Sequence, residues 1–196
     1  MKPRRLCAAV ATIAASLAAS ALPARAAEAA YGIDPTHSFA SVEAPRFGLA
    51  TWQGRLRIVE GRIVLDREAG SGSAELSVSL TSLSSGAASL DAALKGPGFL
   101  DVAASPSAVF TSERIVFAGK NPSEIAGTLR LRDKSAPLTL KALRFNCYLN
   151  PLFLREVCGG DFEARIRPAD WGLPSAAALG LPDELRLVVQ MEASKE

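Results

Sequence analysis

Four segments of the chain alternate apolar and polar residues with a period of two, and this pattern restricts the fold more than any other feature. The segments are 75–81, 125–132, 162–167 and 185–192. In the last of them, leucine, valine and methionine at the odd positions alternate mostly with arginine, glutamine and glutamate. Successive side chains of a strand point to opposite faces of the sheet, so the pattern predicts half-buried antiparallel strands.

Further strands are expected at 36–44, 55–66, 108–117 and 138–147. Within 55–66 the alternation breaks around Gly61, which indicates a bulge or a bend there. Within 138–147 the apolar positions change phase, which also indicates a bulge. Glycine, asparagine, aspartate and proline between the runs supply the turns. Residues 27–30 are expected to be a short disordered start.

One segment has helical spacing. Leucine and alanine recur at intervals of three and four across 84–94, and Gly96 and Pro97 follow to end the helix. Residues 173–182 have neither period and are expected to form a loop with at most one helical turn. With no repeat and no linker, the chain is predicted to be one all-β domain. Eight or so short strands fit either a sandwich or a barrel.

The N-terminal residues have the form of a secretory signal peptide. Basic residues at positions 2, 4 and 5 precede a mostly apolar run, 6–22, and Ala24-Arg25-Ala26 follows as a small-x-small cleavage site. An uncleaved membrane anchor is the alternative, but the run is rich in alanine and shorter than the ~20 residues that a spanning helix needs. We therefore expect cleavage after 26, a mature domain of 27–196, and a periplasmic location.

Cleavage would change the charge and the cysteine count. Four of the 22 basic residues and none of the 20 acidic ones lie in 1–26, so 18 basic residues remain and the net charge moves from +2 to −2. A chain without basic excess is a poor partner for nucleic acid. Cys7 would be lost, leaving Cys147 and Cys158 as one pair in an oxidising compartment. A disulfide is expected; a redox or metal pair is the alternative, although the spacing is not Cys-x-x-Cys.

Residues for catalysis or metal binding are scarce. His37 is the sole histidine, so a hydrolase triad or a histidine-based zinc site would need unusual substitutes. We expect it to be a polar residue near a strand end, hydrogen-bonded to a neighbour. Aspartates such as Asp34 and Asp170 stand singly at strand ends, where they suit turns. No catalytic residues and no metal site are predicted, and the chain is not expected to be an enzyme.

Several segments, in chain order, resemble the YceI-like, polyisoprenoid-binding family of exported bacterial proteins. The similarity covers nearly all of the mature chain. The segments are Tyr31–Ser38, Leu94–Val102 with Ser105–Ser112, Gly127–Leu131 with Pro137–Leu140, Cys158–Asp161, and Arg167–Gly172.

The resemblance implies a single lipocalin-like antiparallel β-barrel of about eight strands, with an elongated apolar cavity that holds a long isoprenoid chain, free or as a quinone tail. No other cofactor is implied, and a transient membrane contact is a further expectation. Taking the apolar side of each strand as inward gives the expected ligand-binding residues. They are Phe99, Phe110, Leu129, Leu131, Phe162, Ile166, Trp171, Leu187, Val189 and Arg46.

Arg46 stands where many members of the family have histidine. It is predicted either to hold an anionic head group or to be a solvated loop residue. Two other functions stay open. One is an enzyme acting on a lipid or quinone, with Arg46, His37 or Asp170 near a cavity mouth. The other is a structural or stress-related interaction module that has a filled barrel and an exposed apolar patch. Oligomeric state is left open.

Overall fold

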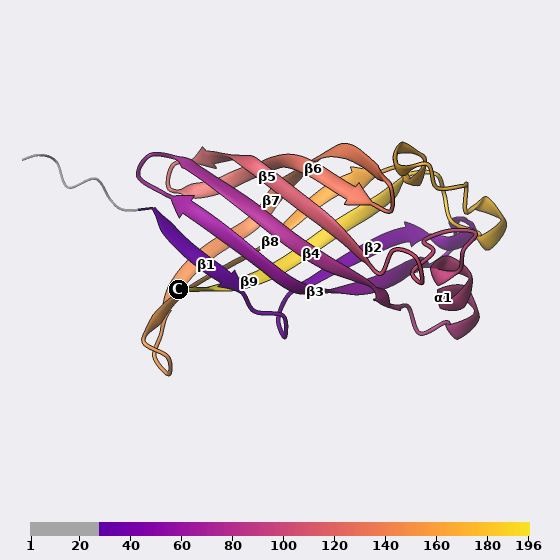
Figure 1. The fold of residues 1–196 in the computed structure, drawn as a ribbon, viewed down its shortest axis with the longest axis horizontal. Coiled ribbons are helices and arrows are strands. Elements are labelled where there is room, and N and C mark those ends of the chain that lie inside the picture. Colours follow the sequence, from indigo (N-terminus) through magenta and orange to yellow (C-terminus); the bar gives the residue numbers. More distant parts are fainter. Residues whose placement is uncertain (1–27) are drawn as a thin grey trace, which may run out of the picture.

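The backbone of residues 28–196 closes into an antiparallel β-barrel (Figure 1). The computed structural model describes these residues; residues 1–27, which include the predicted signal peptide and Cys7, lie outside the described part. The strands are β1 (Ala29–Ile33), β2 (Phe39–Pro45), β3 (Thr51–Asp66), β4 (Ser71–Ser84), β5 (Ser107–Ala118), β6 (Asn121–Leu131), β7 (Lys134–Asn150), β8 (Arg155–Ile166) and β9 (Leu185–Lys195).

Each strand from β2 to β9 pairs with the next, and β9 pairs back onto β2 to close the barrel. Strand β1 also lies between β3 and β9, so β1 and β2 share one position in the barrel. The result is the predicted barrel of eight strand positions. Closure leaves no unpaired sheet edge and directs one face of every strand into a common interior.

The two predicted irregularities in the strands are present. The pairing of β3 with β4 shifts register between Ile58 and Glu60, next to Gly61, and that of β7 with β8 shifts between Ala142 and Arg144. A Cβ at Gly61 would lie 2.7 Å from the carbonyl oxygen of Glu75, so no larger residue fits where these strands approach. The bulges bend the strands, which lets them close a barrel.

The break between β1 and β2 is bridged by one buried serine. The Ser38 hydroxyl donates to the carbonyl of Glu192 at 3.2 Å and accepts from the Glu192 N–H at 3.1 Å. The Asp34 N–H donates to the same carbonyl at 2.8 Å. Side-chain bonds thus replace the missing rungs of the β2–β9 ladder, and the barrel stays closed across residues 34–38.

Two predicted boundaries were wrong. Residues 27–30 were expected to be disordered, but Ala29 and Ala30 begin β1, where pairing with β3 orders them. The helix was expected over 84–94 but is α1 (Ala88–Lys95), because β4 continues to Ser84 and the chain then turns at Gly86. The Asp91 carboxylate accepts bonds from the Ser85 N–H and hydroxyl, which holds this turn against α1.

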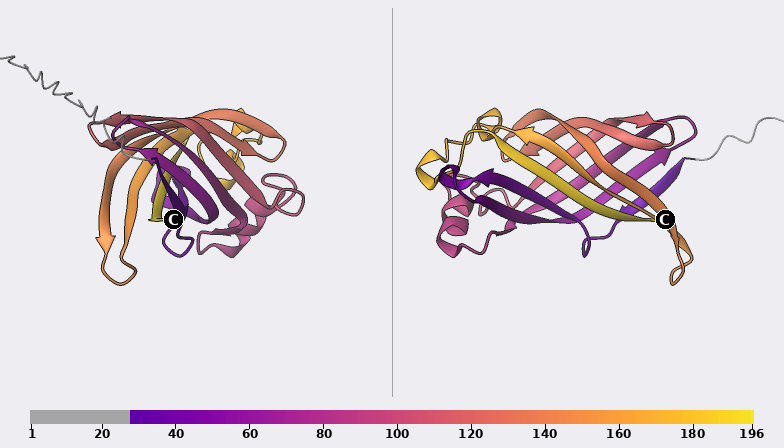
Figure 2. Two further views of the ribbon diagram at one scale, coloured as in Figure 1. Left: turned by 60° about the vertical axis from the view of Figure 1, so that its left-hand side comes forward. Right: turned by 180° about the vertical axis from the view of Figure 1, so that it is seen from behind.

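Irregular segments cover one end of the barrel, and we call them together the cap. They are α1, the segment 96–106, and the segment 167–184, which contains the 3-10 turns η2 (Pro168–Trp171) and η3 (Ala177–Leu179). Figure 2 shows them gathered at the same end from a second direction. The short turn η1 (Arg46–Gly48) between β2 and β3 reaches this end too. None of the helices in residues 28–196 is long and apolar enough to cross a membrane.

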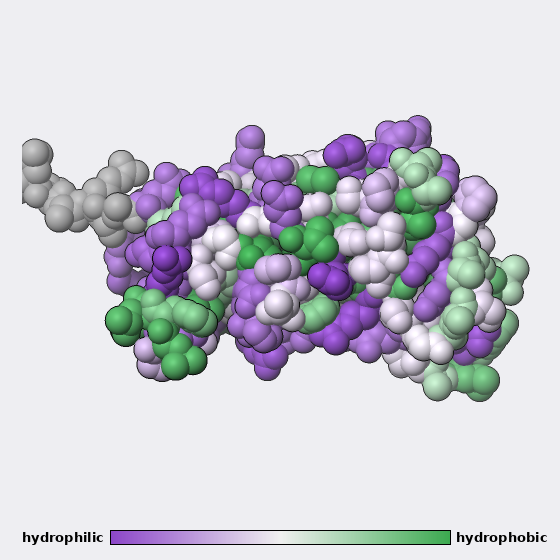
Figure 3. Space-filling model, turned by 60° about the horizontal axis from the view of Figure 1, so that its bottom comes forward, coloured by the Kyte–Doolittle hydropathy of each residue, from purple (hydrophilic) through white to green (hydrophobic). Residues whose placement is uncertain are grey.

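At the other end, the β7–β8 hairpin projects beyond the barrel (Figure 1). Cys147 and Cys158 face each other in its register and form the predicted disulfide, which closes the loop containing Asn150 and Pro151. The tip exposes an apolar patch, visible as the green cluster at the lower left of Figure 3. We call this surface the hairpin tip; its residues are Tyr148, Leu149, Leu152, Phe153 and Leu154.

Replacing both cysteines, Cys147→Ala with Cys158→Ala, is expected to lower the free energy of unfolding by roughly 3 kcal/mol, because the bond closes a short loop in the unfolded chain. Denaturant unfolding of the oxidised and the doubly substituted proteins measures the difference. Titration of two free thiols in the unreduced protein would contradict the bond itself. Replacing Leu152→Ala in the same loop serves as the control, since this side chain is 84% exposed.

Candidate functional site

An apolar cavity of about 150 Å³ lies inside the capped half of the barrel and is partly open to solvent. Within residues 28–196, every residue that lines it is alanine, valine, leucine, isoleucine, phenylalanine, tryptophan or proline. Its side walls come from alternate residues of the strands, and its end wall comes from the cap. For comparison, an engineered apolar cavity of about this volume in another protein holds one benzene molecule. The site is therefore suited to an apolar group and has no charged group with which to react.

Eight of the ten residues expected from the sequence to bind a ligand lie on the wall of this cavity. They are Phe99, Phe110, Leu129, Leu131, Ile166, Trp171, Leu187 and Val189. The period-two alternation placed the strand residues correctly on the inner face. Whether they contact a ligand stays a prediction.

Phe162 and Arg46 do not line the cavity. Phe162 is buried at the register position opposite Val189, and it lines a second apolar cavity of about 30 Å³. Along β9, Val189 belongs to the larger cavity and Met191 to the smaller one. Phe162 therefore stands at the boundary between the two. The resemblance implied one elongated cavity, whereas the structure has two, of about 150 and 30 Å³.

Arg46 is an exposed residue of η1 that ties this turn to the cap. Its Nε donates to the carbonyl of Leu179 at 3.1 Å, and its guanidinium lies 4.9 Å from the centre of the Phe47 ring. The Phe47 N–H donates to the carbonyl of Gly180. Gly180 has a φ of 81°, and a Cβ there would lie 2.6 Å from the Phe47 ring, so the contact requires glycine.

Two further side chains fasten the cap to the strands. The Trp171 Nε1 donates to the carbonyl of Leu129 at 2.7 Å, which holds η2 against β6. A guanidinium nitrogen of Arg132 donates to the carbonyl of Phe99 at 2.9 Å, which holds the segment 96–106. Together with the bond from Arg46, these bonds hold the cap over the end of the cavity.

His37 and Asp34 form a separate polar cluster outside the cavity. The His37 Nδ1 lies 2.7 Å from an Asp34 carboxylate oxygen, which raises the pKa of His37. Partial burial favours the neutral form of Asp34, but bonds from Thr36 and His37 outweigh it and hold the pKa of Asp34 at about 2. The carboxylate of Glu192 brings a third atom of a type that binds metal ions, and it lies within 4.8 Å of the Asp34 and His37 atoms. His37 and Glu192 lie on an open groove of the barrel's outer face, away from the apolar cavity.

The three residues considered for an enzymatic site, His37, Arg46 and Asp170, lie on separate parts of the structure. His37 lies on the outer groove, Arg46 on η1 and Asp170 on η2, and none of the three lines the large cavity. Within residues 28–196 no hydrogen bond or ion pair joins any two of them.

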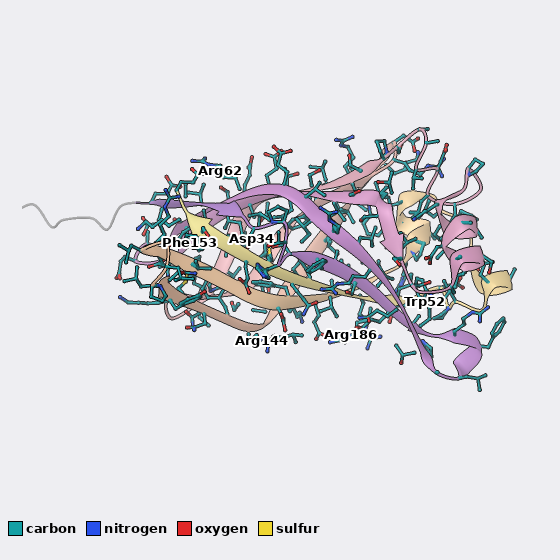
Figure 4. All side chains as sticks on the ribbon, turned by 90° about the horizontal axis from the view of Figure 1, so that it is seen from below. Asp34, Trp52, Arg62, Arg144, Phe153 and Arg186 are labelled. Carbon is teal, nitrogen blue, oxygen red and sulfur yellow. A yellow bond between two sulfur atoms is a disulfide. The ribbon has the colours of Figure 1, made fainter. Side chains whose placement is uncertain are left out.

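The sequence did not predict Trp52, a residue of the cavity wall whose indole ring carries an N–H. Trp52 lines the cavity at the capped end, and Figure 4 shows it at the opposite end of the barrel from Phe153. Trp52 has the same parity as Leu56 and Ile58, which are both buried on the inner face. Extending the alternation of 55–66 backwards by four residues would have found it.

Comparisons with known proteins agree with this geometry. The model of the YceI-like domain matches residues 31–193. The solved structure of BcnA from Burkholderia cenocepacia is similar, with 17% identity and a TM-score of 0.65 over 82% of this chain and 98% of that one. The YceI protein of Campylobacter jejuni has 17% identity and a TM-score of 0.57 over 68% and 79%.

A third similar structure is a polyisoprenoid binding domain from Saccharophagus degradans implicated in plant cell wall breakdown. It has 15% identity and a TM-score of 0.56 over 86% of this chain and 99% of that one. At such identities the likeness shows the fold alone. Comparison with curated protein sequences finds no match.

Replacing Phe162→Ala is expected to join the two cavities, because the ring at their boundary is removed. The same change should lower the free energy of unfolding by about 3–5 kcal/mol, as for other buried phenylalanines. A crystal structure under xenon pressure, with denaturant unfolding, measures both effects. Ile115→Ala is the control, since Ile115 is buried, lines the smaller cavity and pairs with Ile125, which lines the same cavity. Two separate xenon sites in Phe162→Ala would contradict the assignment.

Proposed function

The chain belongs to the YceI-like family, and from this premise we propose that it binds an isoprenoid or quinone-type lipid in the capped apolar cavity. It acts as a periplasmic carrier, store or scavenger of that lipid, and not as an enzyme. The observation that carries the proposal is a cavity inside the barrel whose lining is entirely apolar within the described chain. An isoprenoid tail has no hydrogen-bonding group, so walls of this kind suit it, and burial contributes roughly 25 cal/mol per Å² of apolar surface.

The volume limits how such a lipid binds. A cavity of about 150 Å³ takes a group of roughly benzene size, whereas sites for larger ligands measure roughly 300–1,000 Å³. A long isoprenoid chain therefore has to widen the cavity or extend out of it. The cap is the part that yields, because side-chain hydrogen bonds hold it and not a strand ladder.

The disulfide supports a periplasmic location, because such bonds persist in oxidising compartments. The predicted signal peptide would direct the chain there. No cofactor other than the bound lipid is part of this proposal.

A carrier of membrane lipids needs a transient contact with a bilayer, and we assign that contact to the capped end. Phe47 and Leu49 are 62% and 81% exposed there, and Phe47 contacts the cap at Gly180. A bilayer that received these side chains would lie beside the segments that must open. The lipid could then pass between membrane and cavity without crossing water.

The hairpin tip favours a second candidate function, that of an interaction module. Five large apolar side chains are exposed together there, more than a solvated hairpin needs. The cap and the hairpin tip lie at opposite ends of the barrel (Figures 1 and 4), so the two functions can be tested separately.

Native mass spectrometry of the protein purified from the periplasm, followed by organic extraction, tests the carrier function. A bound apolar lipid in stoichiometric amount is expected, with masses spaced by isoprene units. A bare polypeptide mass, together with no uptake of added prenylquinone, would contradict lipid binding and favour the interaction module.

Replacing Leu49→Asp is expected to reduce cosedimentation with phospholipid vesicles severalfold, because a charged side chain is costly to place among lipid tails. Leu152→Asp is the matched control: Leu152 is 84% exposed, like Leu49, but lies on the hairpin tip. Equal vesicle binding by Leu49→Asp and the unaltered protein would contradict the assignment. Loss in Leu152→Asp alone would move the contact to the hairpin tip.

A further inference from the structure

Strand β7 runs past its neighbour β6 at the base of the projecting hairpin. Its pairing with β6 ends at Lys141, whereas its pairing with β8 continues to Asn150. Within residues 28–196, no strand pairs with the other side of the segment 144–150. The barrel is closed, but the hairpin that extends beyond it has a free edge along this segment (Figure 1), and we call it the β7 edge.

The register at the disulfide shows which main-chain groups the β7 edge presents. Cys147 and Cys158 are register partners, and their Cα atoms lie 4.0 Å apart. That spacing fits an antiparallel pair without mutual hydrogen bonds, at about 4.5 Å, rather than a hydrogen-bonded pair, at about 5.5 Å. The N–H and C=O of Cys147 therefore point away from β8. Those of Phe145 and Leu149 do so too, because the direction of these groups alternates along a strand.

The β7 edge is exposed, and its sequence does little to discourage pairing. Exposed strand edges are usually blunted by lysine, other charged residues or proline. From Phe145 to Asn150 the edge has none of these. No residue of 144–150 is buried, and Tyr148 and Leu149 are 50% and 66% exposed. An edge with free main-chain groups and exposed apolar side chains is a template for another strand.

Contacts within the hairpin hold this edge in one shape. The disulfide joins the two strands, and on the side of β8 the Tyr31 hydroxyl donates to the Glu156 carboxylate. At the turn, the Leu154 N–H donates to the carbonyl of Asn150 at 2.8 Å, and the Asn150 side chain accepts from the Leu152 N–H at 2.9 Å. An edge that is ordered beforehand loses less entropy when it pairs, which favours association.

We propose that the β7 edge pairs with the β7 edge of a second copy of this chain, antiparallel and around a two-fold axis at Cys147. The two hairpins then form one four-stranded sheet. Phe145 lies opposite Leu149 of the second copy on one face, and Asn146 lies opposite Tyr148 of the second copy on the other. Apolar side chains thus meet apolar ones, and polar side chains meet polar ones, as in stable cross-strand pairs.

The β7 edge matches itself in hydrogen bonding and in charge, which favours a second copy as its partner. In this register the outward N–H and C=O groups of one copy face those of the other, so each donor meets an acceptor. The segment 145–150 carries no charged side chain, and Arg144 is paired with Asp161 at 2.7 Å, so like charges do not oppose each other. A two-fold dimer requires a self-complementary surface of this kind.

This inference deepens the second candidate function, since it names a second copy as the partner of the interaction module. It rests on that candidate and not on lipid binding. The cap lies at the other end of the barrel from the hairpin, so both caps stay free in the dimer (Figures 1 and 4). Dimerisation and lipid uptake can therefore be measured in the same preparations.

Proline at position 149 tests the pairing. The N–H of Leu149 points to the second copy and not to β8, so Leu149→Pro removes it without breaking a rung of the hairpin. Leu149→Ala is the matched control, because it loses the same side chain but keeps the N–H. In analytical ultracentrifugation over a range of concentrations, the unaltered oxidised protein is expected to dimerise. Leu149→Pro should raise the dimer dissociation constant at least roughly tenfold over Leu149→Ala, the effect of a lost hydrogen bond.

A charge on the β7 edge gives a second, independent measurement. Leu149→Lys places an ammonium group opposite Phe145 of the second copy and is expected to dissociate the dimer, since lysine on an edge opposes strand pairing. Leu152→Lys is the control: Leu152 is 84% exposed but lies in the turn beyond the edge. Thiol titration checks that the disulfide has formed in every variant.

The outcomes separate this inference from lipid binding. A protein that stays monomeric at every concentration would overturn the inference, and so would equal dissociation constants for Leu149→Pro and Leu149→Ala. Equal loss of the dimer in Leu149→Lys and Leu152→Lys would also overturn it, because the contact would then lie at the turn. A dimer without bound lipid supports the inference and contradicts the carrier function, whereas a monomer with bound lipid does the reverse.

Discussion

The rest of this structure depends on the pairing of β2 with the last strand, β9. Five residue pairs join β2 to β9, from Phe39 with Gln190 to Glu43 with Arg186. Together with the three pairs that join β1 to β9, this ladder removes the two edges that an open sheet would have and encloses the interior. With it, inward side chains from all eight strand positions meet around one axis. Salt bridges from Arg186 to Glu43 and Glu163 connect the three strands at the seam from outside.

Closure alone does not decide whether a barrel of this size is filled or hollow, since eight strands allow either. Here the choice differs along the axis. Near the middle, Ile58, Leu140 and Phe162 are almost fully buried and leave little space. Toward the cap, the void of about 150 Å³ remains. Side-chain size along the strands therefore sets the depth of the cavity.

The alternation predicted antiparallel strands because it is a local property that each strand carries independently, and the resemblance to the YceI-like family then implied a barrel. It also predicted most of the cavity wall, since inward parity along a strand is enough to identify Leu187 and Val189. It could not predict the boundary at Phe162, because that depends on which strands oppose each other and how far their registers shift. The role of Arg46 was likewise out of reach, since its acceptor lies 133 residues away.

The bonds that fasten the cap share a chemical feature. In each, a side chain donates to a main-chain carbonyl: Arg46 to Leu179, Arg132 to Phe99, and Trp171 to Leu129. A main-chain acceptor is present whatever residue occupies its position. The side chains of Leu179, Phe99 and Leu129 can therefore be exchanged without removing the acceptors that hold the cap shut. Phe99 and Leu129 line the cavity, so in evolutionary terms their side chains can vary with the ligand while the hydrogen bonds of the cap persist. Trp171 both lines the cavity and donates one of these bonds, so it is not free to vary in this way.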